Sequence, residues 1–412
     1  MENLKYKPQL QLDIQLQPST QAEVIVKYTG DITQQVEEIG GVTEYLSDNY
    51  AIVTLQLKSI PLLAQLDQIE YIEASKDMYF TENNNLRQSC IYKEGNYIFT
   101  TLNGAGVFVG IIDSGINPRG FTDLQGNTRI RYLWDLSVSG NPPSGFNIGS
   151  EFIGDEIYNA GYDILGHGTA VAGIACGNNI GIAYGSEIIA VKLNNRNGFA
   201  RSTEIMRGIK YIIDKAVENN KPVVINISYG TNDGSHDGRT LFEEYINSMA
   251  DKWKTAIVTA TGNEGNASHH FRGQVVENKT IQADFNIREN TSSVYLSLWK
   301  SFADQMNIRL ISPEGQSSPV MNEYAQRYFF TIGNSNVNVL FGQPTPYTTS
   351  TQVYFSIQGE FIQSGIWQIE ITGMNIIEGY VDIWLPVREG QNADTRFCPL
   401  MSIRHLLFPQ QP

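Results

Sequence analysis

The chain has 412 residues, 41% hydrophobic and 17% charged, which is typical of a globular protein with two or three domains. Its net charge of −14 argues against nucleic acid or an anionic membrane as a partner. No run of about 18 apolar residues is present, and the polar N-terminus does not resemble a signal peptide. Three cysteines, Cys90, Cys176 and Cys398, give no disulfide framework. These features favour a cytoplasmic protein without membrane segments.

Residues 1–80 predict a small α+β module. Apolar runs predict strands at residues 22–28, 50–57 and 69–74, and helical spacing predicts helices at residues 32–39 and 59–66. Ser59 is expected to cap the second helix. The module is either an ordinary accessory domain or an inhibitory propeptide. Residues 81–104 are rich in Asn and Gly and are predicted to be a linker.

From residue 105 the pattern changes to buried strands alternating with amphipathic helices. Apolar runs predict strands at residues 107–112, 188–191, 223–227 and 256–260, and 3.6-residue spacing predicts helices at 202–216 and 241–253. Such alternation over residues 105–271 indicates an α/β domain with a parallel, doubly wound sheet. Sheets of this kind carry their sites at the carboxyl ends of the strands, and Asp113, Ser228 and Asn263 lie at such ends.

Residues 272–388 change character again. Eight short runs rich in β-branched and aromatic residues are separated by turn residues, without a convincing helix. This pattern predicts an inserted all-β domain, either a β-sandwich or a jelly roll. Residues 389–412 follow neither the strand nor the helix pattern and are predicted to be an aberrant tail.

Three residues in this order suggest proteolytic chemistry. A serine protease needs a base for its nucleophile, a carboxylate that orients the base, and hydrogen-bond donors for the oxyanion. Among the five histidines, only His167 has turn glycines on both sides and begins an apolar helical pattern. Asp113 ends an apolar strand upstream, and Asn263 follows another downstream. Asp113 or Asn263 alone is equally compatible with a turn residue. All three residues in this order favour the roles of acid, base and oxyanion donor.

These segments resemble the subtilase family of serine proteases. Ile111-Ile112-Asp113-Ser114-Gly115 is similar to the aspartate motif, Gly166-His167-Gly168-Thr169-Ala170 to the histidine motif, and Thr261-Gly262-Asn263-Glu264-Gly265 to the oxyanion-hole motif. Asn226-Ile227-Ser228-Tyr229-Gly230 resembles the edge strand that pairs with substrate backbone. The resemblance implies a subtilisin-like fold, a peptide or protein substrate bound at Ser228, Tyr229 and Gly230, and no cofactor; it leaves bound calcium open.

A β-rich insertion after the oxyanion asparagine resembles the Csp-type germination proteases of spore-forming bacteria. That resemblance implies a propeptide in residues 1–80, cut by the enzyme itself between about Asp77 and Asn103 and retained as a binding partner. It also implies a spore-associated location as the alternative to the cytoplasm. Pseudoenzymes occur in this branch.

The sequence departs from the family at the nucleophile. No Gly-Thr-Ser-x-Ala-x-Pro string is present, so the predicted sheet is incomplete and the chain as given is expected to be inactive. Ser114 and Ser228 have other expected roles, and Cys398 lacks a turn-to-helix context. A frameshift after Phe397 is one hypothesis for the missing segment, and a natural short terminus is the other. Sequencing the locus distinguishes them, because a frameshift requires a nucleophile motif in a downstream frame.

Two other function classes remain open. A non-catalytic pseudoprotease would act as a binding or signalling scaffold through its cleft and its β-domain. A carbohydrate-binding protein is suggested only by the jelly-roll pattern, and fold alone is a weak argument for function. Retention of Asp113, His167 and Asn263 favours descent from an active protease.

Overall fold

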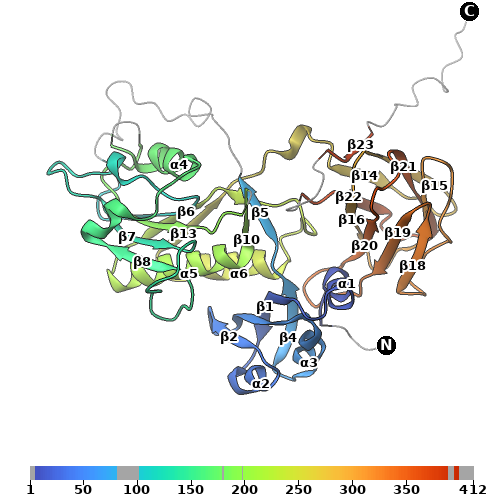
Figure 1. Cartoon of the computed structure of the whole chain (residues 1–412), viewed down its shortest axis with the longest axis horizontal. Coiled ribbons are helices and arrows are strands. Elements are labelled where there is room, and N and C mark those ends of the chain that lie inside the picture. The colour runs from blue at the N-terminus through green and yellow to red at the C-terminus, as the bar shows by residue number, and fades with distance from the viewer. Residues whose placement is uncertain (1–4, 81–101, 179–180, 197, 388–393, 399–412) are drawn as a thin grey trace, which may run out of the picture. The chain divides into compact units, whose positions relative to one another are not determined.

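The computed structural model of the chain describes residues 5–80, 102–178, 181–196, 198–387 and 394–398 (Figure 1). It divides into two compact units. The first comprises residues 1–263 together with 345–348, and the second comprises residues 264–344 and 349–412. Within these described ranges, the short 3-10 segments are η1 (Leu57–Ser59), η3 (Pro118–Gly120), η4 (Gly154–Asn159) and η5 (Glu264–Asn266).

The N-terminal module of the first unit is an antiparallel sheet with helices. Its strands, in the order β2-β3-β1-β4, are β1 (Gln21–Tyr28), β2 (Val42–Tyr45), β3 (Tyr50–Gln56) and β4 (Ile69–Ala74). Its helices are α1 (Pro8–Leu16), α2 (Thr33–Glu38) and α3 (Ile60–Gln65). One face of the sheet shares a buried core with Val36 of α2 and Leu63 of α3, to which β1 contributes Val24 and Val26.

Two details of this module differ from the sequence prediction. Ser59 does not cap α3, because its hydroxyl donates to the Ile39 carbonyl 3.1 Å away and α3 is entered through η1. Helix α1 was not predicted: Pro8 stands in its first turn, and its apolar residues, such as Leu10 and Leu12, fall at every second position, which is not a helical spacing.

The centre of the first unit is a six-stranded sheet. Its strands, in the order β13-β11-β6-β9-β7-β8, are β6 (Phe108–Asp113), β7 (Ile130–Asp135), β8 (Ser150–Ile153), β9 (Glu187–Lys192), β11 (Val223–Ile227) and β13 (Thr255–Thr259). All neighbours pair in parallel except β7 and β8. Figure 1 shows α4 (His167–Cys176) on one side of this sheet and α5 (Ser202–Glu218) with α6 (Leu241–Ala250) on the other.

Coverage on both faces explains the continuous apolar run at residues 107–112. Phe108 and Ile112 share a core with residues of α5 such as Ile209. Val109 and Ile111 point to the opposite face and share a core with Ala172 of α4. A strand buried on both faces shows no polar alternation, which is why the doubly wound sheet could be predicted.

One part of the α4 face is not covered by the described residues. Val109 of β6 is in register with Val224 of β11, so the two side chains lie on the same face of the sheet. Val109 is 8% exposed, whereas Val224 is 39% exposed and Val258 of β13 is 52% exposed. Helix α4 therefore covers β6 and β9, while β11 and β13 present an apolar surface on this face.

A three-stranded antiparallel sheet joins the N-terminal module to the α/β domain. Strand β5 (Asp77–Phe80) lies between β10 (Phe199–Arg201) and β12 (Tyr229–Gly230). The segment that leaves the N-terminal module is thus held by backbone pairing on both of its edges.

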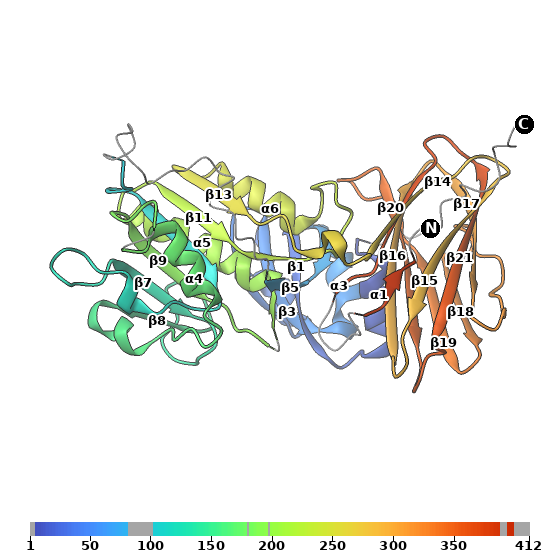
Figure 2. The same cartoon turned by 90° about the horizontal axis from the view of Figure 1, so that it is seen from above.

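The second unit is a β-sandwich (Figure 2). One antiparallel sheet has the order β14-β22-β16-β20-β19-β18, and the other has the order β17-β21-β15-β23. The strands are β14 (His270–Gln274), β15 (Thr280–Ile287), β16 (Ser293–Ser301), β17 (Gln305–Ile311), β18 (Arg327–Ile332), β19 (Ser335–Phe341), β20 (Ser350–Gln358), β21 (Gly365–Asn375), β22 (Tyr380–Trp384) and β23 (Arg396–Phe397). The predicted eight strands are present and enclose one apolar core, whereas β14 and β23 were not predicted.

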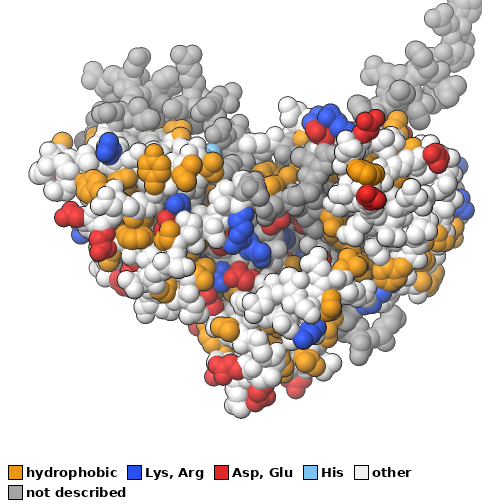
Figure 3. Space-filling view, viewed as in Figure 1, with side chains coloured by type: hydrophobic (Ala, Val, Ile, Leu, Met, Phe, Trp, Pro, Cys, Tyr) orange, Lys and Arg blue, Asp and Glu red, His pale blue; other side chains and the backbone are white. Residues whose placement is uncertain are grey.

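On the surface shown in Figure 3, lysine and arginine side chains lie among acidic and uncharged ones. None of the helices in the described ranges combines the length and the apolar character needed to cross a bilayer.

Candidate active site

Asp113 and His167 form a buried pair. His167 Nδ1 lies 2.7 Å from Asp113 Oδ1, and the two side chains are 7% and 0% exposed. A carboxylate can only accept hydrogen bonds, so Nδ1 donates and Nε2 is left as the basic nitrogen. Burial raises the pKa of Asp113, although the hydrogen bond from His167 acts in the opposite direction. The pair has the geometry of a base held in one tautomer by an acid.

Two glycines allow the histidine segment to approach the aspartate segment. Gly166 caps α4 with φ of 75°, a left-handed conformation that favours glycine. At Gly168, an added Cβ would lie 2.2 Å from the Gly115 carbonyl oxygen, so no other residue fits there. His167 consequently occupies the first position of α4, directly beside the end of β6.

The other predicted site residues lie at the same edge of the sheet. Ile227 at the end of β11 is in register with Ile112, so Ser228 lies at the level of Asp113. The Ser228 hydroxyl accepts from the Asn226 amide at 2.8 Å. Asn263 follows β13 by four residues and is exposed. The carboxyl edge of the sheet thus carries an acid, a base, a serine and an amide.

Strands β10 and β12 leave room between them for one more strand, and the chain's own strand β5 occupies this position, called the cleft below. Tyr79 is in register with Gly230, and Phe80 with Tyr229. On the other side Met78 is in register with Ala200, and the Met78 side chain is 3% exposed. Strand β5 therefore has the extended, doubly paired geometry of a bound peptide.

Tyr229 takes part in this cleft through its backbone. Its ring is only 2% exposed and belongs to the core of the unit, and its hydroxyl accepts from the Asn195 amide at 3.2 Å. Residues 229 and 230 therefore contact the extended segment β5 through their backbone groups. The phenol ring of Tyr229 packs in the core instead.

Buried charges attach the N-terminal module to α5. Arg207 of α5 is 2% exposed and donates through Nε to Glu44 at 2.8 Å. Its terminal nitrogens donate to both carboxylate oxygens of Glu23 at 3.0 and 3.2 Å. Glu23 also accepts from the Thr203 hydroxyl at 2.7 Å. One guanidinium thus binds two acids of the module at once.

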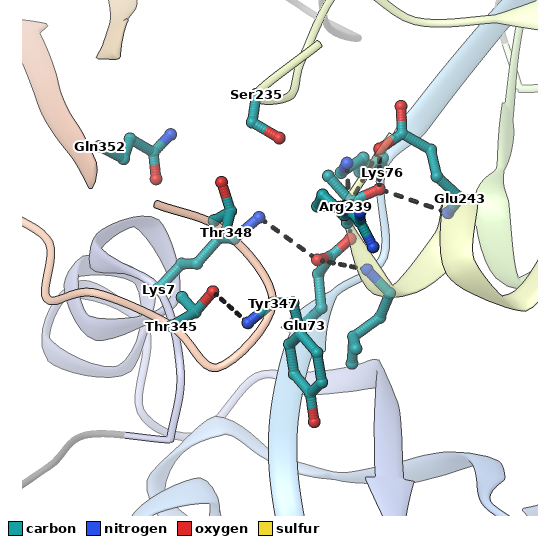
Figure 4. Close-up of polar contacts among 12 residues, drawn as sticks. Lys7, Glu73, Lys76, Ser235, Arg239, Glu243, Thr345, Tyr347, Thr348 and Gln352 are labelled. Carbon is teal, nitrogen blue, oxygen red and sulfur yellow. Dashed lines mark hydrogen bonds and ion pairs between the residues drawn. The ribbon is translucent and has the colours of Figure 1, made fainter. Parts of the chain in front are cut away.

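A third acid of the module meets the start of α6 (Figure 4). Glu73 Oε2 accepts from the Leu241 backbone N–H at 3.1 Å and from Lys7 at 3.3 Å, and Lys76 lies 3.4 Å from Oε1. Burial acts to raise the pKa of Glu73, but Lys7, Lys76 and the Leu241 N–H outweigh it and lower the pKa to about 2. The helix N-terminus and two lysines therefore keep this buried carboxylate ionised.

The pKa of Glu204 is shifted in the opposite direction to that of Glu73. It lies in the first turn of α5, is 4% exposed, and accepts from the Asn194 N–H at 3.2 Å. Burial raises the pKa of Glu204 to about 7 despite the attraction of Arg196. The folded protein therefore holds a proton that the unfolded chain releases near pH 4.5.

This proton makes stability depend on pH. Between pH 4.5 and 7 the folded state binds more protons than the unfolded state, so the free energy of unfolding should fall as the pH rises through this window. Glu204→Gln should remove a cost on the order of 3 kcal/mol at pH 8 and change little at pH 4.5. Urea unfolding at both pH values tests this, with the exposed Glu218→Gln on the same helix as the control. Equal stability of wild type and Glu204→Gln at pH 8 would refute it.

Neither of two side-chain nucleophile candidates in the described residues is activated. The Ser114 hydroxyl is 4% exposed and donates to Asp163 at 2.7 Å. Burial and the neighbouring Asp284 raise the pKa of the Cys398 thiol, which disfavours the reactive thiolate. The described part of the chain also holds no cluster of three or more His, Cys, Asp or Glu side chains suited to a metal ion.

Sequence reasoning missed three features of this site: strand β5, Arg207 and Glu73. The run Met78-Tyr79-Phe80 before the polar segment was a usable signal for β5. Arg207 and Glu73 had none, because a charged residue inside an amphipathic helix or strand usually faces solvent.

Comparison with known proteins agrees with this geometry. Residues 104–302 match the model of the subtilase family, and residues 2–76 match that of the Csp protease B prodomain. The CspB protease of Clostridium perfringens is similar in structure, with a TM-score of 0.66 and 37% identity over 73% of this chain and 65% of that one. Subtilisin-like protease 5 of Arthroderma otae is 34% identical over 137 residues, which are 33% of this chain and 29% of the relative.

The α/β sheet and the family match define residues 104–302 as a subtilase-family domain. Its N-terminal module is a prodomain of the Csp protease B type. The predicted family and the subtilisin-like α/β fold are confirmed. The chain spans less than two thirds of the length of the relatives named above.

Proposed function

We propose that this chain provides the acid, the base and the oxyanion donor of a serine endopeptidase. The observation that supports this most strongly is the 2.7 Å contact between the buried His167 and Asp113 side chains. In this mechanism His167 Nε2 takes the proton of a serine hydroxyl as that oxygen attacks a peptide carbonyl. Asp113 stabilises the imidazolium that results, and Asn263 donates to the oxyanion. His167 then passes the proton to the leaving amine.

The substrate we propose is an extended peptide that takes the place of β5. Backbone groups at Gly230 and Ala200 pair with both edges of β5, and a protein substrate would use the same groups. The prodomain is then the first occupant of the cleft and acts as an inhibitor as long as it stays bound. The similarity to Csp-type proteases supports a role in spore germination and a spore-associated location.

The 412 residues contain no Gly-Thr-Ser nucleophile motif, so we propose that this chain by itself is inactive. The exposed apolar surface of β11 and β13 adjoins Ser228 and the loop of Asn263, and a nucleophile-bearing segment could pack against it.

The purified chain should show no measurable amidase activity. Loss of the nucleophile from a subtilisin-type triad lowers turnover by about a million-fold. A mixture of fluorogenic peptides, assayed with and without a serine-directed phosphonate, tests this. Turnover that the phosphonate abolishes would show that a serine of this chain acts as nucleophile, and the proposal of inactivity would be wrong.

A second candidate function is that of a pseudoprotease scaffold. The observation that favours it is that the chain's own strand β5 fills the cleft. This pairing is stable without any cleavage reaction. A scaffold does not require His167, so a His167→Ala chain should retain all partner binding and biological activity. Loss of function in spores that carry this variant would support the protease.

A further inference from the structure

Asp163 lies in the loop between β8 and α4, four residues before His167. It is 8% exposed and accepts four hydrogen bonds. Oδ1 accepts from the Ser114 hydroxyl at 2.7 Å and from the Gly166 N–H at 3.0 Å. Oδ2 accepts from the Thr169 N–H at 2.8 Å and from the Thr169 hydroxyl at 2.7 Å. All four donors belong to the residues that flank Asp113 and His167.

These bonds continue from one segment into the other. The Ser114 hydroxyl, which donates to Asp163, accepts from the Gly168 N–H at 3.0 Å, and the Ser114 N–H donates to Asp113 Oδ1 at 2.7 Å. Because the carboxylate accepts only, it fixes the direction of the Ser114 hydroxyl and so presents its lone pair to Gly168. His167 is bracketed on both sides by this network.

We infer that Asp163 is a positioning residue, which holds the His167 ring against Asp113. This rests on the proposed function, in which His167 is the base. Asp113 Oδ1 accepts from the Ser114 N–H as well as from His167, and His167 stands at the first position of α4, so the placement of its ring depends on the loop that precedes the helix. Asp163 binds the N–H groups of Gly166 and Thr169 and thereby fixes the backbone from which the ring projects.

The test measures the His167 Nδ1–H proton by nuclear magnetic resonance in the full chain, which needs no nucleophile and no cleavage. A proton held in the contact with Asp113 exchanges slowly with water, and its signal is identified by its absence in His167→Gln. Asp163→Asn should accelerate this exchange at least about tenfold relative to the buried backbone N–H of Ile225, because the loop and the first turn of α4 then open locally more often. This exchange measurement does not depend on protease activity. The positioning role of Asp163 and the proposed endopeptidase function can therefore be refuted independently of each other.

Matched variants separate positioning from charge and from stability. Thr169→Val keeps the shape and the Asp163 charge but removes the hydroxyl, which donates to Asp163 and accepts from the Asn117 N–H, and should also accelerate exchange, whereas Thr169→Ser should match wild type. Asp123→Asn is the structural control, because Asp123 likewise accepts from the N–H groups of Gln125 and Asn127 at 2.9 and 2.8 Å in an exposed turn. It should leave the His167 proton unchanged.

Three outcomes would overturn the inference. The first is equal acceleration of the His167 and Ile225 protons in Asp163→Asn, which would assign Asp163 to global stability. The second is an effect of Asp163→Asn without one of Thr169→Val, which would assign the effect to charge. The third is acceleration in Asp123→Asn of the same size. If Asp163→Asn does not fold, the Thr169→Val and Thr169→Ser pair decides alone.

Discussion

Joining residues 1–397 to the nucleophile-bearing part of a Csp-type relative should produce a protein that cuts its own chain just beyond β5. Tyr79 and Phe80, the last residues of β5, lie opposite Gly230 and Tyr229, and Tyr229 directly follows Ser228 in the chain. The next residue is Thr81, which lies outside the described residues, and we expect the cut within one or two residues of it. A segment tethered in the cleft is cut at high effective concentration, so processing should precede any cleavage of added substrate.

His167→Ala in this extended protein should leave a single uncut band. Removal of the base from a subtilisin-type triad lowers turnover by roughly a million-fold, which would stop even an intramolecular reaction on the time scale of expression. The control is His236→Asn, since His236 is exposed and has φ of 56°, which asparagine tolerates. Mass spectrometry of the products locates the cut. A cut that persists in His167→Ala would assign it to another protease, and a folded but uncut His167 protein would favour the pseudoprotease.

Glu44→Ala should be the most destabilising single substitution in the prodomain. It leaves the guanidinium of Arg207, which is 2% exposed, with only Glu23 as its partner in a buried site. Breaking a buried ion pair from one side typically costs about 3–5 kcal/mol, and Glu23 compensates the desolvated guanidinium only in part. Urea unfolding at pH 7 measures the loss, and limited proteolysis should show earlier cleavage of residues 1–80.

A double-mutant cycle with Arg207→Leu separates the pair from general packing. The double variant Glu44→Ala/Arg207→Leu should cost less than the sum of the two single changes, by about 2 kcal/mol, since no unpaired guanidinium remains. Asp48→Ala is the control, because Asp48 is fully exposed and lies 3.9 Å from the exposed Lys252. Additive costs in the cycle would show that Glu44 acts through packing alone.

Much of the fold could be predicted from residue patterns. The strand at residues 107–112 was recognisable because burial on both faces removes polar alternation, and the strand at residues 223–227 was recognisable from its β-branched residues. Asp113 and His167 were recognisable because turn glycines and apolar runs flank them in a fixed order. Strands β7 and β8 were missed because their polar and aromatic residues obscure both periodicities.

The sequence by itself determined the family, the order of acid, base and amide, and the absence of a nucleophile motif from these 412 residues, because each is a local string. Only the tertiary structure decided which segment fills the cleft and which charges are buried. Strand pairing joins Tyr79 to Gly230, and folding brings Glu44 to Arg207 across 163 positions in the chain. Such contacts depend on the docking of one module on another, and no local periodicity encodes the partner of a single charged residue.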